Sequence, residues 1–357
     1  MASTVQEWTS EALSRLGLAP PEVAERVVRL TGVPDTPTAR EIVELDLCAL
    51  DVSLEVGLPE LLAPQLSWEV HRWAQVSAEE VTSRPWGAVR FVLGEHLDEL
   101  TLLSVLRHVE MADDLAATLV GHDLGNGVRG GLAGLPREVQ EYLGHAVSGE
   151  DLAAVDHVLR LADSGWSVPE LLLGLIVPAQ EELGRLWERG ALSVAQEHMA
   201  TAITHLAMYS LHPRLYEAPR LGCTLVAATV PEDRHSVGLR VVSDLLQRRG
   251  WEVHYVGLSC PMADVIDAVV DSGASLLLLG CSMTCHLPSL RRAVDEVRAD
   301  PRCDGVRVVV GGRPFNQVPE LGTWVGSDLA AGHAIEVLEA TDDLLALAPS
   351  SRAGSIS

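Results

Sequence analysis

Val230-Pro-Glu-Asp-Arg-His-Ser-Val-Gly238 is the stretch that decides the fold, and it directly follows Cys223–Thr229, an apolar run that predicts a buried strand. A helical pattern begins as the stretch ends, so we expect it to form the loop between a strand and a helix. Within it, Asp233, His235 and Gly238 stand in a D-x-H-x-x-G arrangement. Open α/β sheets bind ligands at the carboxyl ends of their strands, so this loop is predicted to meet a ligand.

The acid two residues before the histidine suits a metal-binding imidazole. Asp233 can hold His235 in one tautomer, which is how proteins usually prepare a histidine for a metal. Gly238 lets the following helix begin close to whatever the histidine holds. The loop therefore predicts a bound metal or cofactor, with His235 as its ligand and Asp233 as the residue that orients the imidazole.

Strand-like and helix-like patterns alternate through the carboxyl half of the chain. The strand-like runs are apolar on both faces, as in a buried parallel sheet. Their regular spacing predicts a doubly wound, flavodoxin-like (Rossmann-like) α/β domain over 221–347. The expected strands are Cys223–Thr229, Glu252–Val256, Ser275–Leu279 and Val306–Val310, and the expected helices are Val237–Arg249, Met262–Ser272, Leu287–Arg298 and one near Ala331–Leu347.

All-α regions are expected before the α/β domain. Residues 137–215 predict a compact bundle of three or four helices, and 1–120 predict a further helical domain interrupted by prolines. The glycine-rich residues 121–136 read as a linker between the two, and 348–357 as a flexible tail. In the bundle the predicted N-caps are Ser148 and Ser167, and the predicted helix ends are marked by Gly165, Gly190 and Pro213.

Composition excludes several classes of function. The chain has no lysine, which excludes Schiff-base or pyridoxal chemistry through a lysine. Its formal net charge is -24, which disfavours direct DNA binding. No apolar run approaches the length of a membrane span, and Met1–Trp8 lacks the basic start of a signal peptide, so we expect a cytoplasmic protein. The six cysteines are scattered, which favours small buried side chains over a zinc site.

A second motif lies in the helical bundle. Trp187 is followed ten positions later by the adjacent pair Glu197 and His198, with Gly190 between them to break the helix. The tryptophan is then expected to end one helix and the pair to begin the next, so that all three can face one cavity at the end of the bundle. Alone, this pattern would indicate a buried aromatic side chain and a solvated helix start, where acids are favoured.

Together the two motifs resemble the light-sensing, adenosylcobalamin-binding module of CarH-type photoreceptors, over about residues 140–345. That family places a four-helix bundle over the upper face of the corrin and a flavodoxin-like domain beneath it. The resemblance implies that Trp187 packs over the adenosyl group with Val194 beside it. It also implies that Glu197 and His198 contact the adenosyl group or the corrin rim.

On the lower face, the resemblance implies that His235 coordinates cobalt and that Asp233 orients it. Ser282 matches the serine of the family's S-x-L pattern, which commonly bonds to that acid, whereas Thr284 replaces the leucine and is expected to face the corrin. Gly311 and Gly312 match the paired glycines that let the backbone approach the cofactor's benzimidazole tail. We call the stretch Val230–Gly238 the histidine loop. It supplies the remaining expected cofactor contacts, at Arg234, Ser236, Val237 and Gly238.

Two departures from the family bear on mechanism. Many CarH-type modules have a histidine after the tryptophan that captures cobalt after photolysis, whereas this chain has Glu188. His198, His205, another histidine or water would have to take that place. The amino-terminal region also lacks the basic recognition helix of a winged-helix DNA reader. Histidines and tryptophans recur in its helical patterns. They indicate either core or surface residues of a helical domain or, as in photocobilins, a site for bound biliverdin. These residues are His71, His96, His108, His122, Trp68, Trp73 and Trp86.

The leading expectation is a light sensor without enzyme activity. Photolysis of bound adenosylcobalamin, with biliverdin as a candidate second chromophore, would change conformation, homo-oligomer assembly or the binding of an effector protein. It would do so because the two ligand states differ in their contacts with Trp187. The alternative is a corrinoid carrier protein of a methyltransferase system, which shares the cap, the histidine motif and the fold.

Overall fold

A computed structural model describes residues 20–31, 37–63, 134–188, 190–216 and 218–346, together with short pieces between 65 and 112. The tail at 348–357 and all of the expected linker before Gly134 lie outside the described residues. So do His71, His96, His122, Trp68, Trp73 and Trp86. Among the described helices, none is long and apolar enough to cross a membrane.

The described chain forms two compact units. One unit contains residues from 1–213 together with 284–288, and the other contains 214–283 and 289–346. The chain therefore leaves the second unit at Thr284 and returns to it at Ser289. The predicted division at residues 120, 136, 215 and 347 stays a prediction.

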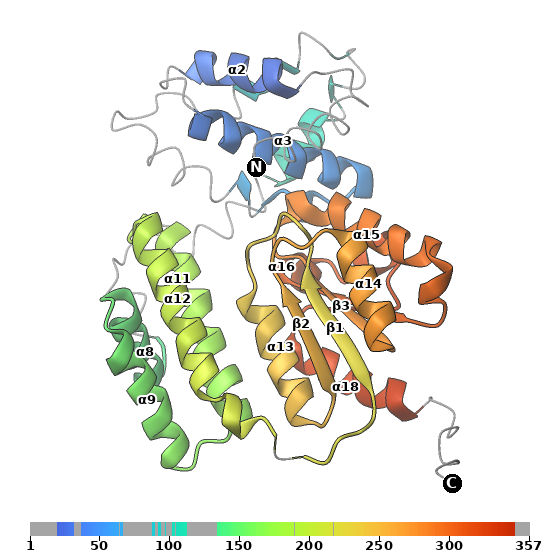
Figure 1. The fold of residues 1–357 in the computed structure, drawn as a ribbon. Helices are drawn as coiled ribbons and strands as arrows, with labels where there is room; N and C mark the ends of the chain where they lie inside the picture. Colours follow the sequence, from blue (N-terminus) through green and yellow to red (C-terminus); the bar gives the residue numbers. More distant parts are fainter. Residues whose placement is uncertain are drawn as a thin grey trace. The chain divides into compact units, whose positions relative to one another are not determined.

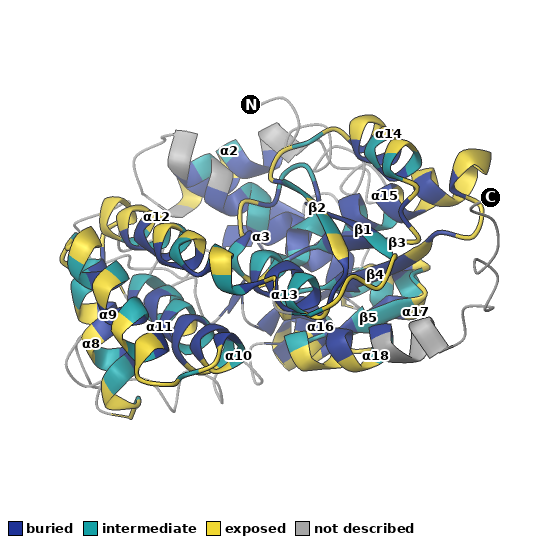
Figure 2. Cartoon of the chain, turned by 60° about the horizontal axis from the view of Figure 1, so that its bottom comes forward, coloured by how far each residue is buried: buried dark blue, intermediate teal, exposed yellow. Residues whose placement is uncertain are grey.

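The second unit contains a five-stranded sheet in the order β2-β1-β3-β4-β5, in which all paired strands are parallel. This is the flavodoxin-like order, so the predicted fold class is confirmed. Figure 1 labels β1, β2 and β3, and Figure 2 labels all five strands. The short β5 was missed, because a run of three residues carries almost no pattern. The strands are β1 Thr224–Thr229, β2 Glu252–Gly257, β3 Leu276–Gly280, β4 Arg307–Gly311 and β5 Leu329–Ala331.

Apolar runs explain why these strands lie at the centre. β1 and β3 are buried along nearly their whole length, and β4 is buried over its three central residues, as Figure 2 shows, because helices cover the sheet. The expected helix near Ala331–Leu347 starts later, at Ala334, because Ala331 ends β5. The helices are α13 Val237–Arg248, α14 Met262–Ser272, α15 Leu287–Ala299, α16 Arg313–Gln317, α17 Leu321–Val325 and α18 Ala334–Ala346, with short 3-10 turns η4 Thr284–His286 and η5 Pro301–Cys303.

The first unit contains the predicted helical bundle. Ser167 caps a helix through a capping box with Glu170, as expected. Ser148 is instead the C-cap of α8, and the prediction was wrong because Gly149, at φ 75°, turns the chain before α9 begins. The elements are α8 Arg137–Val147, α9 Asp151–Asp163, α10 Val168–Leu171, the π-helical turn η2 Leu172–Ile176, α11 Val177–Glu188, α12 Val194–Ser210 and η3 His212–Arg214.

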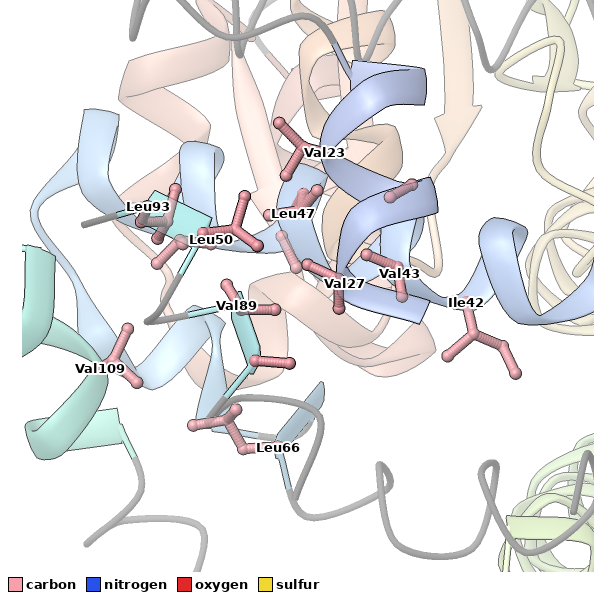
Figure 3. Packing of buried hydrophobic residues seen from close by; sticks show 14 of the residues in the cluster. Val23, Val27, Ile42, Val43, Leu47, Leu50, Leu66, Val89, Leu93 and Val109 are labelled. Carbon is pink, nitrogen blue, oxygen red and sulfur yellow. The ribbon is translucent and has the colours of Figure 1, made fainter. Parts of the chain in front are cut away.

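The described amino-terminal residues are also helical. α2 Pro20–Thr31 and α3 Pro37–Val56 are followed by the 3-10 turn η1 Pro59–Leu61. Their apolar faces share a buried cluster, shown in Figure 3, in which Val27 and Leu47 are fully buried. This cluster supplies the hydrophobic stabilisation that holds the helices together.

Candidate cofactor-binding site

The carboxyl ends of β1, β3 and β4 lie at one edge of the sheet, because Thr229 pairs with Gly280 and Gly280 pairs with Gly311. The histidine loop leaves β1 at this edge. Its start is fixed to the sheet, since the Val230 N–H donates to the Gly280 carbonyl at 3.0 Å. The buried Thr229 hydroxyl donates to the Asp233 carbonyl at 3.0 Å. The loop is thus held by its neighbouring strand before the histidine is reached.

Asp233 is fully buried, and its carboxylate organises the loop. Oδ1 accepts a hydrogen bond from the His235 backbone N–H at 2.9 Å and lies 2.7 Å from Nδ1 of the same residue. The His235 side chain is 60% exposed. Because Asp233 engages Nδ1, Nε2 is the ring nitrogen that can serve as a metal ligand.

Ser282 reaches Asp233 through its backbone and not through its hydroxyl. The Ser282 N–H donates to Asp233 Oδ2 from a position directly after β3. The predicted partnership is therefore present, but with a donor that any residue except proline could supply. This contact joins two loops that are 49 residues apart in the chain.

Glu232, next to Asp233, makes a contact that the sequence analysis missed. The Ser289 hydroxyl donates to Glu232 Oε2 at 2.9 Å, and Ser289 is 5% exposed. Ser289 lies in the first turn of α15. The adjacent carboxylates of Glu232 and Asp233 thus bind opposite ends of the segment that connects β3 with α15.

The glycines of the site meet two different surroundings. A Cβ at Gly238 would have no atom within 4 Å, so the first turn of α13 borders open space. A Cβ at Gly312, where φ is 137°, would lie 2.0 Å from the Cys281 carbonyl oxygen. Gly311 would place a Cβ 3.0 Å from the Ala331 carbonyl oxygen. Close backbone packing therefore explains why Gly312 is glycine, whatever its role toward a cofactor.

The other residues of the histidine loop differ in exposure. Arg234 is exposed, whereas Ser236 is 4% exposed and precedes α13 without a capping hydrogen bond from its side chain. Val237 begins the helix and is half-buried. The exposed surface of the loop is therefore formed mainly by Arg234, His235 and Gly238.

In the helical unit, the second motif spans a helix–turn–helix corner. Trp187 is half-buried in the last turn of α11, and Gly190, at φ 69°, donates its N–H to the Trp187 carbonyl at 2.9 Å. Ser193 then begins α12 with a capping box formed with Gln196. The expected order, in which the tryptophan ends one helix and the Glu-His pair begins the next, is present.

Glu197 and His198 lie in the first turns of α12. His198 Nδ1 is 2.7 Å from Glu197 Oε2, and the Thr201 hydroxyl donates to Glu197 Oε1 at 2.8 Å. The His198 side chain is 69% exposed, and Val194 is also exposed. The polar groups of this corner therefore face solvent within their own unit.

The structure brings the predicted residues together in two groups. Asp233, His235 and Ser282 meet at the edge of the sheet, with the rest of the histidine loop nearby. Gly311 ends β4 at this edge and Gly312 follows it. Trp187, Val194, Glu197 and His198 lie at the corner between α11 and α12. Thr284 begins η4, which groups with the helical unit.

One of the histidines considered for a second pigment is described. His108 Nε2 lies 2.5 Å from the hydroxyl of the fully buried Ser53, which itself donates to the Leu58 carbonyl at 2.8 Å. Burial lowers the pKa of His108, and the carboxylate of Glu60 acts in the opposite direction. These contacts give His108 a place in the packing of the amino-terminal helices, and a role toward biliverdin stays a prediction.

Two ranges of the chain match known B12 binding domains. Residues 139–212 and 223–341 each match a model described as a B12 binding domain. Dimethylamine corrinoid protein 3 of Methanosarcina mazei is 32% identical over 171 residues, which cover 46% of this chain and 99% of that protein. Dimethylamine corrinoid protein 1 of Methanosarcina acetivorans is 30% identical over 177 residues, which cover 48% of this chain and 80% of that protein.

A solved structure agrees with the fold. The monomethylamine corrinoid protein of Methanosarcina barkeri superposes with a TM-score of 0.52 at 17% identity, over 58% of this chain and 98% of that one. At this identity the likeness concerns the fold alone. Residues 1–138 lie outside both matched B12 binding ranges.

Proposed function

This chain belongs to the family of corrinoid proteins and carries its pair of B12 binding domains, and we propose that it carries a methyl group on a bound cobalt corrinoid for a methyltransferase. The observation that carries the proposal is the exposed His235 imidazole, whose Nδ1 is held by the fully buried Asp233. In this role the chain is a binding protein, and catalysis belongs to its partner.

The residues present fit a corrinoid. His235 would hold the cobalt of a bound corrinoid through Nε2, the ring nitrogen that Asp233 leaves available. The open space at Gly238, three residues after His235, leaves room for a ligand. When bound, the cobalt would supply a metal that accepts and releases an alkyl group.

The chain's own residues would hold and tune this ligand. Asp233 keeps the proton of His235 on Nδ1 and presents Nε2, while the Ser282 N–H fixes Asp233 from the neighbouring strand end. We assign the lower-face contacts to Arg234, Ser236, Val237, Gly238, Ser282, Thr284, Gly311 and Gly312. We assign the upper face to Trp187, Val194, Glu197 and His198, on the helical corner.

The named relatives support a methyl carrier more directly than a light sensor. They are called dimethylamine corrinoid proteins, so we propose a methylated amine as the class of methyl donor and a methyltransferase as the protein partner. This favours the alternative of our sequence analysis over its leading expectation.

One observation keeps the light sensor as a second candidate. Trp187 ends α11 and Glu197-His198 begins α12, which is the arrangement that an adenosyl group would require from the CarH-type motif. In this candidate the cofactor is adenosylcobalamin, photolysis alters assembly, and biliverdin is a possible second chromophore bound by the amino-terminal helices.

Binding of hydroxocobalamin to the full chain tests the shared part of both candidates. We expect a stoichiometric complex whose absorption spectrum changes in His235→Ala, because that variant lacks the axial imidazole. His254→Ala removes a half-exposed imidazole from β2 and should leave the spectrum unchanged. An unchanged spectrum in His235→Ala would refute the lower-ligand assignment.

Loading with methylcobalamin and adenosylcobalamin separates the candidates. The carrier predicts that both forms are retained and that illumination of the adenosyl complex leaves its mass in solution unchanged. The light sensor predicts a change of mass on illumination, and it predicts that Trp187→Ala loses adenosylcobalamin but keeps hydroxocobalamin. Equal retention of both forms by Trp187→Ala would exclude that role for the indole.

A further inference from the structure

We propose that residues 282–289 form a strap that couples α3 of the amino-terminal helices to the His235 loop, with Glu232 and Ser289 as positioning residues for His235. The inference rests on the proposed corrinoid binding and extends it to α3, which lies outside both B12 binding ranges. It follows from three hydrogen bonds, one at each end of the strap and one in its middle.

The first end of the strap holds Asp233. The Ser282 N–H donates to Asp233 Oδ2, while Oδ1 of the same carboxylate holds His235. Any displacement of Ser282 must therefore move the carboxylate or break a hydrogen bond to a buried charge. Both outcomes change how the imidazole is held, because unpaired buried charges are costly.

The second end of the strap holds Glu232. The Ser289 hydroxyl donates to Glu232 Oε2 at 2.9 Å, and with 5% of Ser289 exposed this bond has little competition from water. Glu232 and Asp233 are consecutive residues, so the strap grips the histidine loop at two adjacent points. A loop held at two adjacent points is fixed in orientation as well as in position.

The middle of the strap is held by α3. Cys48 of α3 donates its thiol to the Cys285 carbonyl at 3.2 Å, and both cysteines are buried. η4, which contains Cys285, groups with the helical unit, whereas Ser282 and Ser289 group with the sheet. The strap thus leaves the sheet, contacts α3 and returns, all within eight residues.

The strap is short and restrained, so movement of its middle is transmitted to its ends. Pro288 fixes its own backbone φ angle next to the fully buried Leu287. A change in α3 would therefore shift Ser282 or Ser289, and through them the carboxylates that hold the His235 loop. Because coupling between two sites is reciprocal, binding of a ligand at His235 would also change the position or mobility of α3.

Paired variants of the full chain test the strap. Ser289→Ala removes the donor to Glu232, and Ser289→Thr keeps a hydroxyl. Cys48→Ala removes the donor to Cys285, and Cys48→Ser keeps one. Cys303→Ala is the matched control, because this buried cysteine lies in η5 and not in the strap.

Hydrogen–deuterium exchange of the protein without corrinoid is the first measurement. In Ser289→Ala we expect the amides of 232–237 to exchange roughly tenfold faster, as for a lost hydrogen bond to a charged group. In Cys48→Ala we expect a rise of roughly twofold in the strap and in the same loop. Ser289→Thr, Cys48→Ser and Cys303→Ala should match the parent protein. Unchanged exchange in 232–237 in both alanine variants would overturn the proposal.

The second measurement reports on the imidazole itself. After reduction of bound hydroxocobalamin to the cobalt(II) state, one axial imidazole nitrogen splits the paramagnetic resonance lines into triplets. We expect the parent protein to show triplets throughout, and Ser289→Ala to lose them in part of the population. If the parent binds corrinoid with triplets and Ser289→Ala is identical, the strap is refuted while the proposed function stands. If the parent binds no corrinoid, the proposed function fails and the strap loses its role with it.

Discussion

Two acid–histidine pairs, one in each unit of the protein, have the same geometry and different surroundings. Asp233 and His235 are joined at 2.7 Å, and Glu197 and His198 are also joined at 2.7 Å. In both pairs the histidine is mainly exposed and is held through Nδ1. The acids differ, because Asp233 is fully buried whereas 25% of the Glu197 side chain is exposed.

The partners of the two carboxylates explain what the difference means. Asp233 also accepts hydrogen bonds from two backbone N–H groups, one of which comes from the end of another strand. Glu197 accepts its second bond from Thr201, one turn further along the same helix. A fully buried acid that is anchored by distant backbone fixes an imidazole. A partly exposed acid with local partners adds less, because water can compete for its hydrogen bonds. A short distance between an acid and a histidine therefore does not by itself show that the fold fixes the imidazole.

The largest effect is expected from removing the buried acid. Asp233→Ala leaves the N–H groups of His235 and Ser282 without their acceptor, so we expect the free energy of unfolding to fall by about 2–4 kcal/mol. Corrinoid affinity should fall by about 10–100-fold, as is typical when the residue that orients a metal-bound histidine is lost. Urea unfolding and titration with hydroxocobalamin measure the two effects.

Asp233→Asn provides the matched comparison for this variant. The amide keeps a carbonyl acceptor of the same shape but cannot serve both the ring Nδ1–H and the Ser282 N–H. Its loss of stability should therefore be smaller than that of the alanine variant, while its corrinoid affinity is still reduced. Parent-like affinity in both variants would show that the buried acid does not present His235.

The sequence allowed prediction of the fold and of the pair at its centre, for physical reasons. Apolar runs identified β1, β3 and β4 because their burial demands such residues, and the D-x-H spacing placed an acid beside the histidine. The contacts of Ser282 and Ser289 could not be derived in the same way. The Ser282 contact is made by its backbone N–H, which has no sequence signature. The Ser289 contact depends on where α15 begins relative to the histidine loop.

A buried charge elsewhere in the sheet unit gives the next effect. Burial raises the pKa of Asp244 to about 6, although Arg240, at 2.7 Å, opposes the shift. The pKa of Asp244 is higher in the folded protein than in the unfolded chain. Protonation of Asp244 therefore contributes to the free energy of unfolding in full below about pH 4, and this contribution is lost as pH rises through about 6. Asp244→Asn cannot ionise and still offers Arg240 an acceptor. We expect it to gain about 1–3 kcal/mol relative to the parent between about pH 4 and about pH 7.5.

Urea unfolding of both proteins at the two pH values measures this gain. His108 makes the parent less stable as pH drops below about 6.5, because its pKa is lowered in the folded protein. This contribution is the same in the Asp244→Asn variant, so it cancels when the free energy of unfolding of the parent is subtracted from that of the variant. A difference that does not change with pH would mean that Asp244 is ionised in the folded protein as readily as in the unfolded chain.

The smallest effect is expected at Glu197, the partly exposed acid with local partners. Glu197→Ala removes the partner of His198 and Thr201, but both remain able to bond with water, so the free energy of unfolding should change by less than about 0.5 kcal/mol. The same measurements used for Asp233→Ala apply, and Arg137, which pairs with Glu141 on the exposed surface of α8, offers a control in Arg137→Ala. A loss of stability in Glu197→Ala comparable to that in Asp233→Ala would mean that the α12 pair is as firmly built as the loop pair. If only cobalamin retention falls, Glu197 acts on the ligand and not on the fold.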